Sequence, residues 1–166
     1  MKRFRIVIIA LVVLFSVVMI FASLIPAETR VSRAINIRGN RDSMKHSLLD
    51  LRQWPLWHPN LKNRNDSNPV TFSAAGDTLL YNGFTVQVSP ESDSSVNVDM
   101  TNREGNKMRS TINIIKMHGD TCAVNWYVLF HSKWYPWEKF RSMFYDQMHG
   151  PSLDSNLLKF KGYIEK

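Results

Sequence analysis

Most of the chain between Thr78 and Phe130 alternates apolar with polar residues, and this period of two constrains the fold more than any other feature. Such alternation is typical of strands that bury one face of a sheet. Tight-turn residues separate the segments, and Asn82-Gly83 is the strongest hairpin signal among them. Together with two earlier segments, the pattern predicts a seven-stranded antiparallel meander with strands at residues 29–37, 70–74, 78–81, 84–88, 96–101, 108–114 and 122–130.

The last third of the chain, Trp134 to Lys166, has helical periodicity instead. One apolar stripe consists of Trp137, Phe140, Phe144 and Met148, and a second consists of Leu153, Leu157, Phe160 and Ile164. At about 100° per residue the second stripe starts roughly 160° around the axis from the first, so one straight helix cannot bury both. Glycine suits a helix end and proline a helix start. Gly150-Pro151 therefore predicts a break between a helix at about 136–149 and another at about 151–164.

The N-terminal segment has the composition of a helix surrounded by lipid and not by water. Three basic residues precede Ile6–Ile25, which is 20 residues long and contains no charge. At about 1.5 Å per residue such a helix spans the roughly 30 Å hydrocarbon core of a bilayer. A cleaved signal peptide is the alternative, but its apolar region is usually about 7–15 residues long, and no clean A-x-A site follows here. The sequence favours a retained transmembrane anchor at 1–25 and a single domain at 26–166.

The distribution of charges bears on how the chain is oriented in the membrane and on which partners it binds, but it settles neither question fully. The short basic N-terminus is the usual form of a signal anchor with its N-terminus in the cytoplasm, although four arginines follow on the other flank. We therefore expect a single-pass protein of the cell membrane with an extracytoplasmic domain. Without Lys2, Arg3 and Arg5, 18 Lys and Arg face 14 Asp and Glu, a net charge of +4. These charges are scattered, which argues against nucleic-acid binding and indicates no particular protein partner.

Two short elements are expected between the first strand and the meander. Asp42 or Ser43 can cap a short helix that runs through Leu51. Trp54-Pro55-Leu56-Trp57-His58-Pro59 then predicts a rigid turn or single helical turn, because proline restricts the backbone on both sides of itself. The two tryptophan rings either plug the core between helix and sheet or line a cavity wall.

This order of elements, and two of its segments, resemble the START-like helix-grip superfamily (SRPBCC), the polyketide cyclase/dehydrase and lipid transport group. Asp50–Pro59 is similar to its D-x-x-x-W-P-x-W-x-P segment, and Gly150–Lys161 to the G-P-x-(aromatic or leucine)-acid-x-x-L-x-x-L-K ending of membrane-anchored members. Phe160 departs from it, since leucine is more usual there. The resemblance covers residues 29–166. It implies an α+β fold in which a curved seven-stranded antiparallel sheet grips the long C-terminal helix around an apolar cavity. It implies no reaction.

The residues themselves indicate no catalytic centre, cofactor or metal. None of the five histidines has another ligand at metal-binding spacing, and His149 is expected to favour a helix C-terminus. Cys122 shares a strand face with Val124 and Trp126, which predicts a buried hydrophobe, and a single cysteine allows no internal disulfide. The nearest candidates for acid–base work are expected to point outward: Glu138, Asp146 and Tyr127.

The strongest candidate site is an apolar cavity under the C-terminal helix. The expected lining is Trp54, Trp57, Trp126, Val128, Phe140, Phe144 and Met148. The main hypothesis is a membrane-tethered module that binds a hydrophobic small molecule or lipid. A cyclase- or hydrolase-type enzyme is the first alternative, and it requires a buried carboxylate or histidine in the cavity. A ligand-free interaction domain of the cell envelope is the second, and a solid core would favour it.

Overall fold

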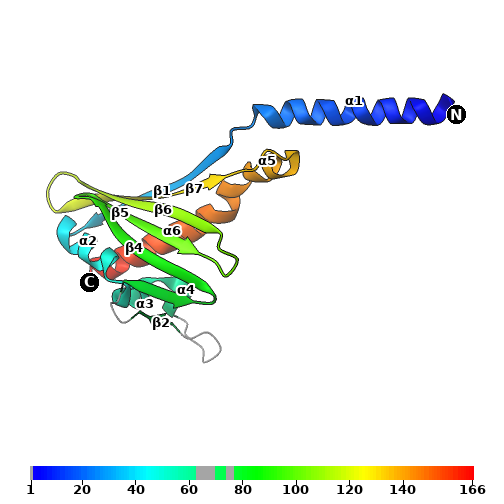
Figure 1. Cartoon of the computed structure of the whole chain (residues 1–166). Coiled ribbons are helices and arrows are strands. Elements are labelled where there is room, and N and C mark those ends of the chain that lie inside the picture. Colours follow the sequence, from blue (N-terminus) through cyan, green and yellow to red (C-terminus); the bar gives the residue numbers. More distant parts are fainter. Residues whose placement is uncertain (1, 63–69, 74–76) are drawn as a thin grey trace.

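The computed structural model describes residues 2–62, 70–73 and 77–166 (Figure 1). Ala74 of the second expected strand lies outside these residues. In chain order the elements are α1 (Lys2–Leu24), β1 (Glu28–Arg38), α2 (Arg41–Leu49), η1 (Leu51–Gln53), α3 (Trp54–Trp57), α4 (Pro59–Lys62), β2 (Thr71–Phe72), β3 (Thr78–Tyr81), β4 (Phe84–Ser92), β5 (Ser95–Thr101), β6 (Lys107–Lys116), β7 (Thr121–His131), α5 (Pro136–Ser142) and α6 (Tyr145–Ile164).

The strands of the described residues form one antiparallel sheet in the order β1-β7-β6-β5-β4-β3-β2, which confirms the predicted seven-stranded sheet. β1 pairs with β7 along its whole length, from Glu28 opposite His131 to Arg38 opposite Thr121, so the first strand joins the last. In the β3–β4 turn, Asn82 and Gly83 have φ angles of 47° and 78°. A two-residue hairpin turn with both residues left-handed matches the twist of its strands.

The sheet curves around α6, which packs against β1, β7, α3 and α4 (Figure 1). The alternation seen in the sequence places one face of each strand in this core, and Cys122 is buried there as predicted. α6 contributes the second predicted stripe, and its buried apolar residues include Leu153, Leu157 and Phe160. The helix-grip architecture is therefore confirmed.

The two short elements lie between β1 and β2 as expected. Asn40, rather than Asp42 or Ser43, caps α2, because its Oδ1 atom accepts a 2.7 Å hydrogen bond from the Asp42 backbone N–H. α2 ends at Leu49, and the Trp-Pro-Leu-Trp segment forms the single helical turn α3. The Trp54 Nε1 atom donates a 2.9 Å hydrogen bond to the Leu48 carbonyl oxygen, which holds α3 against the end of α2.

The break in the C-terminal helix lies at Met143-Phe144 and not at Gly150-Pro151, so its predicted position is wrong. α6 continues through residue 150 with Pro151 inside it, and the helix is bent. A proline inside a helix removes one backbone hydrogen bond and costs about 3 kcal/mol or more. Contacts from outside the helix must offset this cost.

The Arg33 side chain of β1 provides such contacts. Its Nη1 atom lies 2.8 Å from Oδ1 of Asp146 and its Nε atom lies 3.1 Å from Oδ2 of Asp154, about one turn to either side of Gly150. The hydrogen bond from Arg33 lowers the pKa of Asp146. A Cβ atom at Gly150 would collide with the guanidinium. Gly150 therefore permits a close approach of strand to helix and does not end the helix.

This packing predicts that replacing two glycines of α6 by alanine changes the stability by different amounts. A Cβ atom at Gly162 meets nothing within 4 Å, so Gly162→Ala should raise the free energy of unfolding by about 0.5–1 kcal/mol through helix propensity. Gly150→Ala should give no such gain, because it displaces Arg33 from both aspartates. Thermal unfolding of the two variants, followed by circular dichroism, measures the difference. Equal stabilisation of both would contradict the role given to Arg33.

The apolar stripe predicted on the first part of the C-terminal helix faces outward instead of into the core. Trp137 is 65% exposed and Phe144 is 55% exposed, whereas Lys139 and Ser142 are buried. The Lys139 Nζ atom donates a 3.1 Å hydrogen bond to the carbonyl oxygen of Ile25, just after α1. A cation suits the last carbonyls of a helix and the negative end of its dipole. The end of α1 thus supplies a partner that turns the polar face of α5 inward.

Candidate ligand-binding cavity

A cavity of about 410 Å³ lies between the concave face of the sheet and α6. This volume is within the roughly 300–1,000 Å³ that is typical of ligand pockets. Its lining is largely apolar and consists of Trp54, Leu61, Phe84, Val86, Val98, Met100, Met108, Trp126, Val128, Phe130 and Leu153. Polar residues complete it: His58, Asn60, Tyr81, Asn82, Ser110, His149, Ser152 and Asn156.

The cavity lies beneath one end of the sheet. Its strand residues come from the starts of β4 and β6, such as Phe84 and Met108, and from the ends of β5 and β7, such as Met100 and Phe130. Because neighbouring strands are antiparallel, the starts of β4 and β6 and the ends of β5 and β7 lie at the same end of the sheet. β1 also begins there, since Glu28 pairs with His131, and β1 follows α1 directly (Figure 1). The cavity is therefore at the end of the domain from which α1 leaves.

Three of the seven residues expected to line a cavity do so, namely Trp54, Trp126 and Val128. Trp57 lies outside the lining. It is buried with its ring centroid 5.3 Å from that of Trp54 and 4.9 Å from that of Phe160. Both interpretations of the tryptophan pair thus apply, because Trp54 forms part of the cavity wall and Trp57 plugs the core.

The three residues expected from the C-terminal helix are not in the lining. Phe140, Phe144 and Met148 are exposed at the surface instead. The prediction assumed that a helix buries its apolar stripe, and it did not include the contact between α5 and α1. α6 instead reaches the cavity through other residues, among them His149 and Leu153. His149 lies inside α6 rather than at a helix end, and its ring stacks on Phe130 at 4.6 Å.

Sequence reasoning missed the methionine pair and the histidines of the lining. Met100 and Met108 are opposite each other on β5 and β6, one position from the turn that joins these strands. Each methionine is an even number of residues from the buried apolar residues of its own strand and so lies on the same face. The alternation and the strand register alone could therefore have predicted both as lining residues. His58 had no such signal, because its place depends on how α3 packs against the sheet.

Buried polar atoms give the apolar cavity a hydrogen-bonding capacity. His58 Nδ1 and Trp126 Nε1 are buried and have no hydrogen-bond partner within the described part of the chain. Burial lowers the pKa of His58 to about 4, so its imidazole is neutral near pH 7. Its ring also stacks on Trp54, with centroids 5.8 Å apart. The described lining includes no carboxylate. The arrangement can hold an apolar body and offer hydrogen bonds to one polar group.

His58 should make the stability of the domain depend on pH. Its pKa is lower in the folded state than the unfolded value of 6.5, so the unfolded state binds a proton first as the pH falls. The contribution of neutral His58 is complete above about pH 6.5 and is lost progressively toward pH 4, by roughly 2–3 kcal/mol. Urea unfolding at a series of pH values should show a smaller loss in His58→Gln than in His118→Gln, a histidine on an exposed turn. Equal pH dependence in the two variants would contradict burial of a neutral His58.

No family model and no curated protein matches this sequence. Solved structures do match it. A START superfamily protein from Mycobacterium smegmatis superposes with a TM-score of 0.58 and 12% sequence identity, over 82% of this chain and 97% of that one. A truncated norcoclaurine synthase from Thalictrum flavum gives a TM-score of 0.57 and 11% identity, over 82% of this chain and 93% of that one.

A second structure of the synthase, in complex with dopamine and hydroxybenzaldehyde, gives a TM-score of 0.55 at 11% identity, with 87% of this chain and 91% of that chain covered. At such low identities the likeness is one of fold. The protein has a START-like helix-grip fold with a cavity between the sheet and α6, as the resemblance in its sequence implied.

Proposed function

We propose that the protein is a membrane-tethered module that binds a hydrophobic small molecule or a lipid. The observation that carries this proposal is the position of the cavity. Its largely apolar lining lies under the end of the sheet that is nearest to α1. A molecule that partitions into the bilayer would therefore meet the cavity close to the membrane surface.

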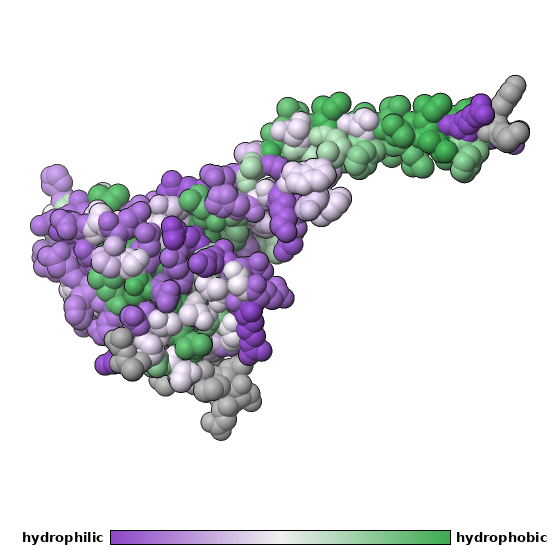
Figure 2. Space-filling model, in the orientation of Figure 1, coloured by the Kyte–Doolittle hydropathy of each residue, from purple (hydrophilic) through white to green (hydrophobic). Residues whose placement is uncertain are grey.

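The tether is supported by α1. Residues Arg3–Leu24 form a helix of 22 residues that is long and apolar enough to cross a membrane. Nearly all apolar side chains of this helix are exposed (Figure 2). Among the residues of α1 whose side chains the structure describes, Ala22 is buried. Apolar surface on this scale is not stable in water and marks a membrane or protein contact. A signal sequence would share these properties, so the length of the run remains the argument for a retained anchor.

The lining also suggests the chemistry of the ligand. An apolar body of moderate size would contact the methionines and aromatic rings of the wall. A single uncharged polar group could accept a hydrogen bond from Trp126 Nε1 or share one with His58 Nδ1, which otherwise have no described partner. Buried polar groups of this kind are costly unless they are paired. The best-suited ligands are amphiphiles with a hydroxyl, carbonyl or ester group.

A cyclase- or hydrolase-type enzyme is a second candidate, favoured by His58 in the cavity and by the shared fold with norcoclaurine synthase. A general base works best when its pKa is near the working pH, and that of His58 is lowered to about 4. Binding is therefore better supported than catalysis. A solid core would have favoured the ligand-free interaction domain, and a cavity of about 410 Å³ argues against it.

The proposal is tested on the full-length protein taken from cells directly into polymer-bounded nanodiscs, without detergent. Organic extraction followed by mass spectrometry should find one class of lipophilic compound enriched over the surrounding lipid, at about one molecule per cavity. A lipid profile identical to that of empty membrane particles, together with no uptake of a fluorescent fatty alcohol, would refute the proposal.

A further inference from the structure

Among the described residues of the domain, a set of exposed large apolar side chains lies on α5 and its flanks. It consists of Trp134, Trp137, Phe140, Met143, Phe144 and Met148, which we call the α5 patch. Trp134 is 69% exposed and Met143 is 62% exposed. Large apolar side chains gathered in this way usually mark an interaction site.

The α5 patch is held facing outward. On the opposite side of α5, Lys139 is bound through its Nζ atom to the carbonyl oxygen of Ile25, and the buried Ser142 Oγ atom donates a 2.7 Å hydrogen bond to the Lys139 carbonyl oxygen. Rotating α5 to bury its aromatic residues would break the first bond and leave a buried lysine unpaired. The exposure of the patch is thus a consequence of the packing.

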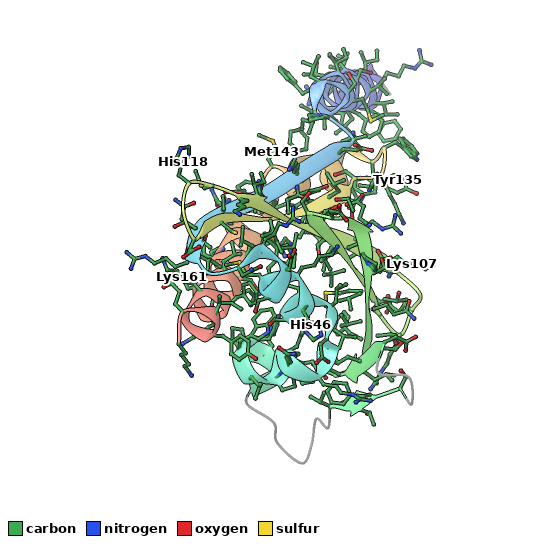
Figure 3. The ribbon with its side chains drawn as sticks, turned by 90° about the vertical axis from the view of Figure 1, so that its left-hand side faces the viewer. His46, Lys107, His118, Tyr135, Met143 and Lys161 are labelled. Carbon is green, nitrogen blue, oxygen red and sulfur yellow. The ribbon has the colours of Figure 1, made fainter. Side chains whose placement is uncertain are left out.

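The position of α5 identifies what the patch meets. α5 packs against the last turns of α1, where Ala22 is buried (Figure 1). The apolar run of α1 ends at Ile25, so at about 1.5 Å per residue Ala22 lies roughly 5 Å from the end of that run. In a spanning helix this is the depth at which hydrocarbon gives way to headgroups. In Figure 3, Tyr135 and Met143, at the two ends of α5, are the labelled residues nearest to α1.

The segment between α1 and β1 also helps to hold α5 next to the end of α1. The Ser132 backbone N–H donates a 2.7 Å hydrogen bond to the Ala27 carbonyl oxygen, and β1 pairs with β7 from Glu28 onward. α5 follows β7 after four residues. α1 and the α5 patch are therefore anchored to the same two strands, and Figure 2 shows pale residues of intermediate hydropathy directly against the end of the apolar helix.

The composition of the patch suits a membrane interface. The Tyr135 ring stacks on that of Trp137 with centroids 5.0 Å apart, and the Trp134 ring lies tilted against Tyr135 with centroids 4.8 Å apart. Tryptophan and tyrosine are enriched at the headgroup level of membranes, where one side of the ring is apolar and the other is wet. Lys133 and Arg141 are exposed beside them and can meet anionic headgroups.

We propose that the α5 patch inserts into the headgroup–acyl boundary of the bilayer that α1 spans, as a second contact that fixes the tilt of the domain. This inference rests on the membrane anchor of the proposed function. Phe130 lines the cavity, and its ring lies 4.8 Å from that of Tyr145, the first residue of α6. Tyr145 directly follows Phe144 of the patch, so the chain leads straight from the inserted patch to a residue that contacts the cavity wall. Insertion would turn the cavity end of the sheet toward the lipid.

The test uses the full chain with Cys122→Ala and one added cysteine, labelled with an environment-sensitive fluorophore. Trp137→Cys places the label in the patch, Met117→Cys places it on the β6–β7 turn at the far end of the sheet, and Val12→Cys places it in the middle of α1. Each protein is reconstituted into vesicles of phosphatidylcholine and phosphatidylglycerol. We expect the label at 137 to be quenched by lipids brominated near the headgroup, and its quenching by aqueous iodide to be at least about threefold weaker than at 117.

The outcomes separate the inference from its premise. If the label at 12 is quenched by lipids brominated deep in the acyl chain while the label at 137 is as open to iodide as that at 117, the anchor stands and the inference is overturned. If 137 is shielded from iodide but brominated lipid does not quench it, a protein surface such as a second copy covers the patch, and the inference is again overturned. If the label at 12 is open to iodide, the tether itself fails, and the inference fails with it.

Discussion

Val128→Trp should weaken the binding of a fluorescent fatty alcohol at least about tenfold, a loss of about 1.4 kcal/mol or more of binding free energy. Val128 lines the cavity, and an indole in place of its isopropyl group would project into a cavity of about 410 Å³ and take up space that the ligand needs. Fluorescence titration of the full-length protein in nanodiscs measures the loss. This is the largest effect on binding that we expect from one substitution.

The next residue along β7 supplies the matched control. Leu129 is on the opposite face of the sheet and is 36% exposed, so Leu129→Trp adds the same side chain outside the cavity and should leave the affinity unchanged. Overpacking at position 128 could cost about 1–3 kcal/mol of stability, so thermal unfolding must show that the variant is folded at the assay temperature. Unchanged binding in folded Val128→Trp, or equal losses in both variants, would mean that the probe binds elsewhere.

Phe160→Ala should lower the free energy of unfolding by about 3–5 kcal/mol, the usual cost of removing a fully buried aromatic side chain. Phe160 is 1% exposed, and its ring lies 4.9 Å from that of Trp57 in an edge-on arrangement. The pair holds α6 against α3. Since single domains are stable by about 5–15 kcal/mol, this one change would remove a large part of the total.

A neighbouring leucine on α6 provides the comparison for this prediction. Leu158 is 60% exposed, so Leu158→Ala should change the free energy of unfolding by no more than about 0.5 kcal/mol. Urea unfolding of both variants, monitored by tryptophan fluorescence, measures the difference. A loss below about 1 kcal/mol for Phe160→Ala would show that α6 is not held at this point.

The strands could be predicted because their signals are local. Alternation with a period of two assigns each residue to a face without knowledge of the rest of the chain, and Asn82-Gly83 specifies a hairpin turn by its backbone preferences alone. The rigid turn at Trp54–Trp57 follows equally from proline restricting its neighbours. The fold could therefore be identified from the sequence, together with three of the residues that line the cavity, Trp54, Trp126 and Val128.

The boundaries and the buried faces of the C-terminal helices were predicted less well, because they depend on contacts with residues far away in the sequence. Gly150-Pro151 has the composition of a helix boundary, but Arg33, far away in the sequence, binds aspartates on both sides of it. The stripe with Trp137 has the composition of a buried face, but Lys139 finds its partner at the end of α1. In both places a tertiary contact outweighed the local preference.

The sequence by itself determined the number of strands, the type of the fold and the apolar run that can span a membrane, because periodicity, turn chemistry and hydrophobic length act within short segments. Only the tertiary structure decided that a cavity remains between Trp54, Trp126 and α6, that it lies at the α1 end of the sheet, and that the α5 patch faces outward. These features depend on how well side chains from separate segments fill the space between them and on which polar groups find partners, and neither is encoded in any one segment.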